Sequence, residues 1–591
     1  MSSPVWFSIP EFTGIQQHKD GRLLPITSAY DARNIDTSDG NLSVAKGFSK
    51  LYAGGNVYKV PGSSIIKKLI MVPGLPNPYN FYVVTGTTIY RHKADTGVWS
   101  VAYDDDTSAD FAFGSSIVTQ SVNTLTARIG NDDVILVCTT LNPIVVIKLS
   151  NGHVRSFGSG LLYKPSYSSN NYVSYNSSTR KLTMDTNWST EYKTRALAFG
   201  IYYGPDTSHL TYAAVESVPS NTSLILRDQP SAAFASGDNI WPAGGSSNVD
   251  VLTAVMFAGR LFAAKGGAPS VRLNWSAVPG DGRTIEDWTM VDGSEDASGG
   301  YVEVGDNTYD SIVGLTALSN QLIIWKKYSV WRLLGDRPST FTLELVEKNT
   351  FGINAQPYQL RPLVFHDAPY FMLEDGLYTY DTVGIVPVDN GGSHIKRFLA
   401  GLTDANLRWS RSTLHKRRFY ISCRVGNHDS NFYDNALVVF DTTTGAYMIR
   451  DGFEIADIVS DGQYIFLING DRYIYKFEDG NTYDGTKIHA YWQTQPIDFG
   501  RKMYRHQLMG MYMQLTGGDV KINITGDYAG SSKELVAKKD TTRKGYIAVR
   551  VQTDQSNEFS FTFDNKTGNS TYTNFAIKGG INIKTLSELK E

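Results

Sequence analysis

Short runs of alternating apolar and polar residues, each about the length of a strand, recur along the chain from about residue 56 to residue 492. Each recurrence joins an apolar run to an aromatic-rich run, with Gly or acidic residues between them. Examples are FYVVTGTTIYRHKADTGVW (81–99) and YIFLINGDRYIYKFEDG (464–480). Alternation with a period of two predicts strands, and no stretch shows sustained helical spacing. The pattern therefore predicts an almost entirely β chain.

The recurring unit predicts a β-propeller, because self-similar sheets of this length bury their apolar faces only against their neighbours. Seven segments align as blades: 56–103, 117–158, 249–288, 309–348, 356–390, 406–452 and 455–494. Dipeptides that tolerate positive φ mark the tight turns. We expect such turns at Gly40, Asp375-Gly376 and Asp461-Gly462, and a longer hairpin loop at 441–445.

Two stretches interrupt this period and predict further domains. Residues 160–248 are rich in Ser, Asn and Tyr and contain short alternating runs, which indicates a small inserted β-domain. The tail, 495–591, contains strand-length runs separated by turn residues, which is typical of a β-sandwich. The predicted order is an N-terminal arm with entry strands (1–55), the first part of the propeller (56–159), the insertion (160–248), the second part (249–494) and the sandwich (495–591).

Composition excludes several classes of protein. The 591 residues are 41% hydrophobic and 19% charged, a profile of neither a disordered nor a membrane-spanning chain. A net charge of −3 does not favour a general nucleic-acid binder. The start of the chain, MSSPVWFSIP, has no basic and apolar signal pattern, so we expect no signal peptide. Cys138 and Cys423 lie in apolar runs and are expected to be buried free thiols.

No catalytic, cofactor or metal signature is present among the motifs considered, which include G-x-S-x-G, H-E-x-x-H and the P-loop. We therefore predict no enzyme and no cofactor. Asp95-Thr-Gly97-Val-Trp99 is similar to the Asp-box turn of sialidases, but it lacks the leading Ser and is one residue short. A purely structural turn, with Asp bonded to its own backbone, is the preferred interpretation.

The densest charge runs also have two interpretations each. Residues 104–106 are three consecutive Asp, which suits a solvated loop better than a Ca²⁺ site, because Ca²⁺ loops alternate their ligands. Residues 416–418, Lys-Arg-Arg, precede a strand and suggest an exposed edge or gatekeeper, with a phosphate or partner contact as the alternative. The alternating aromatics Tyr473, Tyr475 and Phe477 indicate core packing rather than a sugar site.

Three blocks resemble the β-propeller proteins of bacteriophage tail nozzles and hubs, of the tail tubular protein B type. The first is YDARNIDTSDGNLSVAKGFSKLY (30–52), in which Asn34, Gly40, Lys46 and Gly47 carry the resemblance. The second comprises 305–336 and 351–382, with the aromatic pair Trp325 and Trp331 and a turn that ends in Tyr378. The third, PIDFGRKMYRHQLMGMYMQL (496–515), resembles the entry into the family's C-terminal sandwich.

The resemblance implies a structural protein of the virion tail, assembled in the cytoplasm of the bacterial host. Such proteins form a homo-oligomeric ring, typically a hexamer, around the channel through which the genomic DNA passes without sequence recognition. Portal or adaptor proteins and tail fibres or plug proteins are the implied partners. Another virion position (head–tail stopper, baseplate or fibre attachment) and, from a different class, a carbohydrate-binding or sialidase-like propeller stay open as alternatives.

Overall fold

The structure is a computed structural model, and its description covers most of the chain. The described residues are 4–17, 24–53, 56–72, 79–94, 96–117, 122–140, 142–157, 170–189, 192–193, 196–197, 200–205, 211–213, 215–242, 251–265, 271–280, 283–288, 295–305, 310–348, 362–373, 376–381, 384–388, 394–399, 411–423, 436–500, 504–528, 531–540 and 545–589. They form two compact units. Unit 1 comprises 1–59, 370–379 and 385–591, and unit 2 comprises 60–369 and 380–384.

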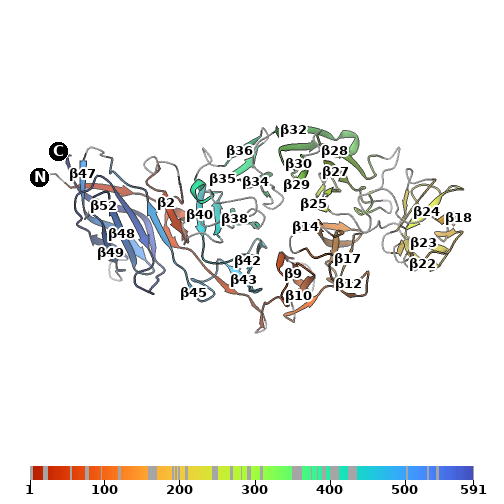
Figure 1. Ribbon diagram of the computed structural model, residues 1–591, viewed down its shortest axis with the longest axis horizontal. Coiled ribbons are helices and arrows are strands. Elements are labelled where there is room, and N and C mark those ends of the chain that lie inside the picture. Colours follow the sequence, from red (N-terminus) through yellow and green to blue (C-terminus); the bar gives the residue numbers. More distant parts are fainter. Residues whose placement is uncertain are drawn as a thin grey trace. The chain divides into compact units, whose positions relative to one another are not determined.

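Unit 2 contains four antiparallel sheets whose strands follow one another in chain order, as in propeller blades (Figure 1). The first sheet is β8 (Ile66–Met71), β9 (Tyr79–Thr85), β10 (Ile89–Lys93) and β11 (Val98–Val101). The second is β14 (Val122–Ile129), β15 (Asp132–Thr139), β16 (Val145–Lys148) and β17 (Val154–Ser156), extended by β12 (Tyr103–Asp104) and β13 (Ala109–Asp110). The third is β25 (Val251–Phe257), β26 (Arg260–Lys265), β27 (Arg272–Trp275) and β28 (Gly300–Glu303). The fourth is β29 (Ile312–Ala317), β30 (Gln321–Lys326), β31 (Ser329–Leu334) and β32 (Thr342–Lys348), with the 3-10 turn η3 (Pro338–Thr340) before its last strand.

Separate apolar layers hold successive sheets of unit 2 together. Tyr82 and Val84 of the first sheet pack with Ile135 and Val137 of the second. The opposite face of the second sheet packs on the third, and the third packs on the fourth through a layer that includes Phe262. The second and third sheets therefore bury both faces, which explains the long apolar run VILVC of β15.

The inserted segment 160–248 forms a sheet of its own in unit 2. Its strand order is β21 (Thr211–Ala213), β20 (Ile201–Gly204), β24 (Asn239–Pro242), β18 (Asn170–Asn176), β19 (Lys181–Met184), β23 (Ser223–Leu226) and β22 (Val215–Ser220). Its buried core, which includes Leu182, Trp188 and Ile240, draws every member from within the insertion. The insertion is thus a small β-domain with its own core.

Three further blade-like sheets follow along the chain. One is β33 (Leu363–Phe365), β34 (Ala368–Leu373), β35 (Gly376–Tyr380) and β36 (Ile385–Pro387). The next is β37 (Arg411–His415), β38 (Arg418–Cys423), β39 (Ala436–Asp441) and β40 (Ala446–Arg450). The last is β41 (Asp457–Ser460), β42 (Ile465–Ile468) and β43 (Ile474–Phe477), joined by β5 (Phe48–Lys50), then β44 (Thr482–Tyr483) and β45 (Thr486–Lys487). Within the described residues, the fold is therefore an all-β, β-propeller fold with seven blade-like sheets, an inserted β-domain and a C-terminal β-sandwich.

The fourth strand of the last blade is not where the sequence predicted it. That blade was expected within 455–494, but β5 from the N-terminal segment pairs with β43. β46 (Tyr491–Thr494) pairs instead with β2 (Ala29–Arg33) and β51 (Phe559–Asp564) in the sandwich. Sequence alternation marks strands but not partners, so it did not assign β5 to a sheet that begins 400 residues later.

The C-terminal sandwich consists of two sheets in unit 1 and also uses the N-terminal segment. One sheet has the order β3 (Ile35–Asp36), β4 (Leu42–Val44), β52 (Ala576–Leu589), β47 (Tyr504–Thr516) and β50 (Tyr546–Arg550), and β1 (Val5–Ile9) also pairs with β52. The other has the order β2, β46, β51, β48 (Val520–Gly526) and β49 (Lys533–Ala537). Phe499 links the sheets, because its ring contacts both Phe7 and Phe559. The described residues of segment 1–55, which the sequence predicted as an N-terminal arm with entry strands, thus contribute strands to the sandwich and to the last blade.

The remaining described elements are short. They are β6 (Tyr52–Ala53), β7 (Asn56–Val57), the 3-10 turn η2 (Ser38–Gly40) and the helix α2 (Lys396–Leu399).

Candidate functional site: an N-terminal clamp

Residues 29–50, strands β2 to β5, make many polar contacts with distant segments of unit 1, and we call them the N-terminal clamp. Asn34 lies at its centre and is 1% exposed. Its side-chain amide nitrogen donates to the carbonyl oxygens of Asp451 (2.9 Å) and His489 (2.8 Å). Its side-chain oxygen accepts from the Asp451 N–H (2.7 Å) and the Tyr483 hydroxyl (2.8 Å). One side chain therefore joins the clamp to the ends of the last two blades and to the entry of the sandwich.

The backbone of Asn34 is also committed to this position. Its φ is 53°, in the left-handed region that Asn tolerates better than most residues. Its N–H donates to the Ile449 carbonyl at 2.8 Å, and its carbonyl accepts from Ala45 at 2.9 Å. Asn is suited to this position because the site needs both a positive φ and a short side chain with donors and acceptors.

Two glycines of the clamp have different roles. Gly40 ends η2 with φ at 71°, and its N–H donates to the Thr37 carbonyl at 3.2 Å, as a tight turn requires. Gly47 lies so close to the last blade that a Cβ atom there would stand 1.9 Å from the Thr482 carbonyl oxygen. Its N–H donates to the carbonyl of Gly480 at 3.0 Å. A side chain at Gly47 would therefore push β5 away from β44, its parallel neighbour in the last blade.

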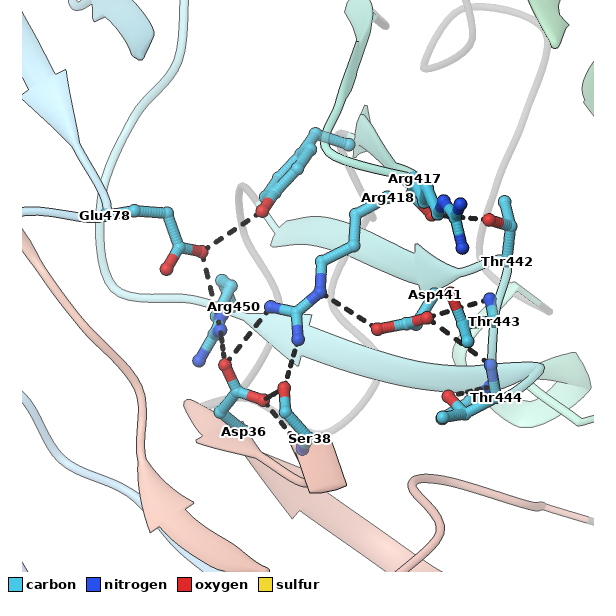
Figure 2. A network of polar contacts seen from close by, with 12 residues as sticks. Asp36, Ser38, Arg417, Arg418, Asp441, Thr442, Thr443, Thr444, Arg450 and Glu478 are labelled. Atoms are coloured by element: carbon cyan, nitrogen blue, oxygen red, sulfur yellow. Dashed lines mark hydrogen bonds and ion pairs between the residues drawn. The ribbon is translucent and has the colours of Figure 1, made fainter. Parts of the chain in front are cut away.

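An ionic network joins the N-terminal clamp to the sixth blade, the sheet β37–β40 (Figure 2). The Asp36 carboxylate lies 3.2 Å from Arg418 and 3.5 Å from Arg450. Arg418 also pairs with Asp441 at 3.0 Å and donates to the Ser38 hydroxyl. The Arg450 side chain is fully buried, whereas those of Asp36 and Arg418 are 19% and 18% exposed. Such a network is costly to break, because each buried charge depends on its partner.

The network continues into the last blade and shifts the pKa of its members. Glu478 lies 3.6 Å from Arg450 and accepts from the Tyr420 hydroxyl at 3.4 Å. Burial alone would raise the pKa of Asp36, but Arg450 and Arg418 outweigh it and hold that pKa far below its usual value. Burial, reinforced by Glu478, raises the pKa of Tyr420. Asp36 is therefore a permanent anion and Tyr420 a permanent hydrogen-bond donor at neutral pH.

The polar groups of the clamp hold chain segments of unit 1 together rather than forming a reaction centre. Asp36 is paired with Arg418 and Arg450. The side-chain amide of Asn34 is bonded to backbone groups and to the Tyr483 hydroxyl. Within the described ranges, no group of three or more His, Cys, Asp or Glu side chains is placed to hold a metal ion. The same ranges contain no helix that is both long and apolar enough to cross a bilayer.

The turn residues expected from the sequence lie on several hairpins. Gly462 has φ at 88°, and the Asp461 carboxylate accepts from the N–H groups of Gln463 (2.8 Å) and Tyr464 (2.5 Å) between β41 and β42. The 441–445 loop forms the β39–β40 hairpin with Gly445 at φ 69°. Asp375 lies outside the described residues, and Gly376 begins β35 opposite Leu373.

The packing residues expected from the sequence differ in burial. Trp325 is 1% exposed, and its indole N–H donates to the Thr316 hydroxyl at 2.9 Å, so it is a core residue of the fourth sheet. Trp331 is half-buried and packs against the layer between the third and fourth sheets. Tyr378 is half-buried on β35, with its ring stacked on Phe371 at 6.4 Å. Trp325 and Trp331 thus belong to the same sheet, and Tyr378 to another.

The acidic run 104–106 is only in part the solvated loop that the sequence suggested, because Asp106 is exposed but Asp104 and Asp105 are not. Asp104 is only 9% exposed and accepts from the Asp106 N–H and the Thr107 hydroxyl, and burial raises its pKa. Asp105 lies 2.7 Å from both Lys148 and His153. The run therefore closes the second sheet by local hydrogen bonds and ion pairs.

The basic run 416–418 is likewise only in part an exposed edge. Lys416 and Arg417 form the β37–β38 turn with φ at 46° and 66°. Arg418, the first residue of β38, turns into the ionic network instead, which the sequence interpretation had wrong. Its two carboxylate partners, Asp36 and Asp441, lie 382 and 23 positions away, so the local pattern carried no signal for them.

The remaining expectations concern aromatics and cysteines. Tyr475 and Phe477 are each 2% exposed in the core between the sixth and last sheets, which confirms core packing, and Tyr473 packs against the same core. Cys138 and Cys423 are buried free thiols, as expected, and burial raises the pKa of Cys423 to about 12. Asp95 of the Asp-box-like turn lies outside the described residues.

Among the described residues, unit 2 presents a groove built from the first strands of three of its sheets. Residues of β14, β25 and β29, together with Pro362 and Val364, line a volume of about 210 Å³. The Asn123 side chain donates to the Thr253 hydroxyl at 2.9 Å between two of these strands. None of the lining residues is charged. They are Asn123, Thr124, Leu125, Thr253, Ala254, Val255, Gly314, Leu315, Thr316, Ala317, Pro362 and Val364.

Comparisons with known proteins add similarities of low degree. No family model and no curated protein matches the chain. Among solved structures, BamB from Moraxella catarrhalis is similar at 9% identity and a TM-score of 0.33, covering 80% of this chain and 97% of its own. A quinonprotein alcohol dehydrogenase-like protein from Bacteroides thetaiotaomicron is similar at 10% identity and a TM-score of 0.29, covering 69% and 76%. These TM-scores carry no argument about function, and the fold follows from the sheets themselves.

Proposed function

We propose that this protein is a structural subunit of a bacteriophage tail, a nozzle or hub protein that forms a homo-oligomeric ring around the DNA channel. The observation that carries the proposal is the N-terminal clamp. Asn34, Gly40 and Gly47, which carry the resemblance of the first block to tail propellers, lie at the hydrogen-bond hub, the turn and the close strand contact of this segment. Residues with these roles fix the position of the segment, which favours a structural protein over an enzyme.

A mechanical role agrees with how the clamp is built. β5 completes the last blade, β2 joins one sandwich sheet and β3 and β4 join the other. Strands β2 to β5 therefore connect the last blade to the sandwich within unit 1. A mechanical load on either part is shared by many backbone hydrogen bonds. A ring subunit that holds, seals and opens needs such stiffness, and heterologous contacts that close by rotation generate rings.

The uncharged groove of unit 2 supports the proposal that DNA passes the protein without sequence recognition. Phosphate binding by proteins depends on Lys and Arg, and its strength rises with the number of such contacts. The groove between β14, β25 and β29 is lined by Thr, Asn and small apolar residues and by no cation, whereas Arg128 of β14 lines the neighbouring groove beside β8 together with Asp133. The groove between these three strands therefore offers no charged contact to a phosphate. The portal or adaptor, fibre or plug partners of the subunit, the virion position and the hexameric order are parts of the same proposal.

Negative-stain electron microscopy and mass photometry of the purified full-length protein test the ring. We expect closed ring particles with one dominant order, six by the family's example, alone or after addition of the portal and adaptor proteins encoded with it. Mass spectrometry of purified virions should find the protein in a fixed ratio to the portal. A protein that stays monomeric with these partners and is absent from virions would overturn the proposal.

A further inference from the structure

One face of the C-terminal sandwich exposes three aromatic side chains. Trp6 of β1 is 54% exposed, Tyr512 of β47 is 39% exposed and Tyr546 of β50 is 62% exposed. The rings of Trp6 and Tyr512 lie 5.0 Å apart at 54°. Large aromatics are normally buried in a core, so a group of them on one sheet face indicates a binding surface.

The strand register places polar groups between these rings. Tyr512 lies opposite Asn582 on one side and Ala548 on the other. Gln514, two residues further along the same face, lies opposite both Lys578 and Tyr546. Amide and ammonium groups therefore alternate with aromatic rings across β52, β47 and β50.

Cations extend this face, and carboxylates are missing from its groove. Trp6 lies opposite Lys584, whose ammonium is 5.8 Å from the indole ring. Gly510 lies opposite Lys584 and Arg550, so a second row combines a Trp with two cations. The groove beside Tyr512 has a volume of about 500 Å³, within the range of small-ligand sites. Its lining residues include one charge, Lys578, and no carboxylate: Tyr512, Met513, Gln514, Tyr546, Ile547, Ala548, Lys578, Gly579, Gly580 and Asn582.

A β-bulge shapes the floor of the groove. The register of β52 against β47 shifts between Met513 and Gln514, so that Gly579 and Gly580 are extra residues. Gly579 has φ at 63° and open space where a Cβ would stand, whereas a Cβ at Gly580 would lie 2.0 Å from the Ile9 carbonyl oxygen. Bulges of this kind redirect side chains at binding sites. Here the two glycines bring no side chain into the groove, and Lys578 beside them is exposed.

We propose that this face binds an acidic polysaccharide. The apolar faces of the sugar rings stack on Trp6, Tyr512 and Tyr546. The side-chain amides of Asn582 and Gln514 form hydrogen bonds with the sugar hydroxyl groups. The cations Lys578, Lys584 and Arg550 attract the sugar carboxylates. The alternation of rings and polar groups distinguishes this surface from an apolar protein-docking patch, and the charge pattern selects an anionic ligand. The proposal does not depend on the tail function proposed above.

Binding of the full-length protein to soluble polysaccharides tests the site. Polygalacturonate, alginate, hyaluronate and polysialic acid serve as acidic probes, and dextran serves as the neutral one, measured by affinity electrophoresis or calorimetry. We expect at least one acidic polymer to bind about tenfold more tightly than dextran, with an affinity that falls as salt rises. Tyr512→Ala should weaken binding about tenfold, and Lys578→Gln should reduce the preference over dextran.

Tyr464→Ala is the matched control, because Tyr464 has the same 39% exposure but lies on the last blade of unit 1. It should bind as the unmodified protein does. Thermal unfolding of each variant confirms that the fold is retained, which is expected for exposed positions. Failure of all four acidic polymers to bind, equal binding of dextran, or full binding by Tyr512→Ala would each overturn the proposal.

Discussion

The carboxylate of Asp36 lies 3.2 Å from the guanidinium of Arg418, although 382 positions separate the two residues in the chain. The same carboxylate reaches Arg450, whose side chain is fully buried. This relationship holds the N-terminal clamp against the sixth blade, and it leads directly to the first prediction.

Asp36→Asn should destabilise unit 1 by about 2 kcal/mol or more, because it leaves the buried guanidinium of Arg450 and the partly exposed one of Arg418 short of a counter-charge. The midpoint of urea unfolding measures this change. The lowered pKa of Asp36 means that its contribution is present above the ordinary Asp pKa of about 4 and is lost as pH falls further. Asp336→Asn, at a pair in which the Asp side chain is 81% exposed, is the control and should change little.

Asn34→Ala should cost about 3 kcal/mol or more. The change removes four side-chain hydrogen bonds and leaves buried partners, including the Tyr483 hydroxyl, without their bond to Asn34. It also places Ala at a φ of 53°. Asn176→Ala is a control, since its exposed side chain bonds only to nearby residues 178 and 179. Unchanged resistance of Asn34→Ala to denaturant would contradict the hub role.

Gly47→Ala should displace β5 from the last blade, because the new methyl group would meet the Thr482 carbonyl oxygen. We expect a large loss of stability and faster proteolysis near β5. Gly480→Ala provides the contrast: Gly480 bonds to Gly47 but has open space around its Cβ position, with φ at 74°. That change should cost only the backbone strain of about 1 kcal/mol. Equal stability of the two variants would show that β5 does not pack as described.

His92 should make the stability of unit 2 depend on pH in mildly acidic solution. Burial lowers the pKa of His92 to about 4, and its Nδ1 lies 2.7 Å from the side-chain oxygen of Asn80. Because the unfolded chain binds a proton near pH 6.5, stability is complete above that pH and is lost as pH falls towards about 4. His92→Asn should flatten the dependence of the urea midpoint between about pH 7 and 4. Parallel pH profiles would refute this account.

Trp325→Ala should cost about 3–5 kcal/mol, because the ring is fully enclosed and its N–H is bonded to Thr316. Trp331→Ala should cost less, since the Trp331 ring is only half-buried. Thermal unfolding of both variants measures the difference. A larger loss for Trp331 would mean that it, rather than Trp325, anchors the fourth sheet.

The alternation of apolar residues was enough to predict the strands, the all-β class, the inserted domain and the sandwich. Period-2 patterning and turn chemistry act between neighbouring residues, so a local reading captures them. Gly462 and the 441–445 loop show this, because the residues that form each hairpin lie within a few positions of one another. The burial of Cys138, Cys423, Tyr475 and Phe477 follows from the same pattern.

Tertiary structure alone decided which distant segments meet. β5 completes a sheet that begins more than 400 residues later, Arg418 leaves the expected edge for Asp36, and Asn34 bonds to Asp451 and His489. The aromatic face of the sandwich likewise exists only because β1, β47 and β50 belong to one sheet. Strand alternation gives each strand a buried and an exposed side but no partner, and partners are selected by burial and hydrogen bonding of the whole chain.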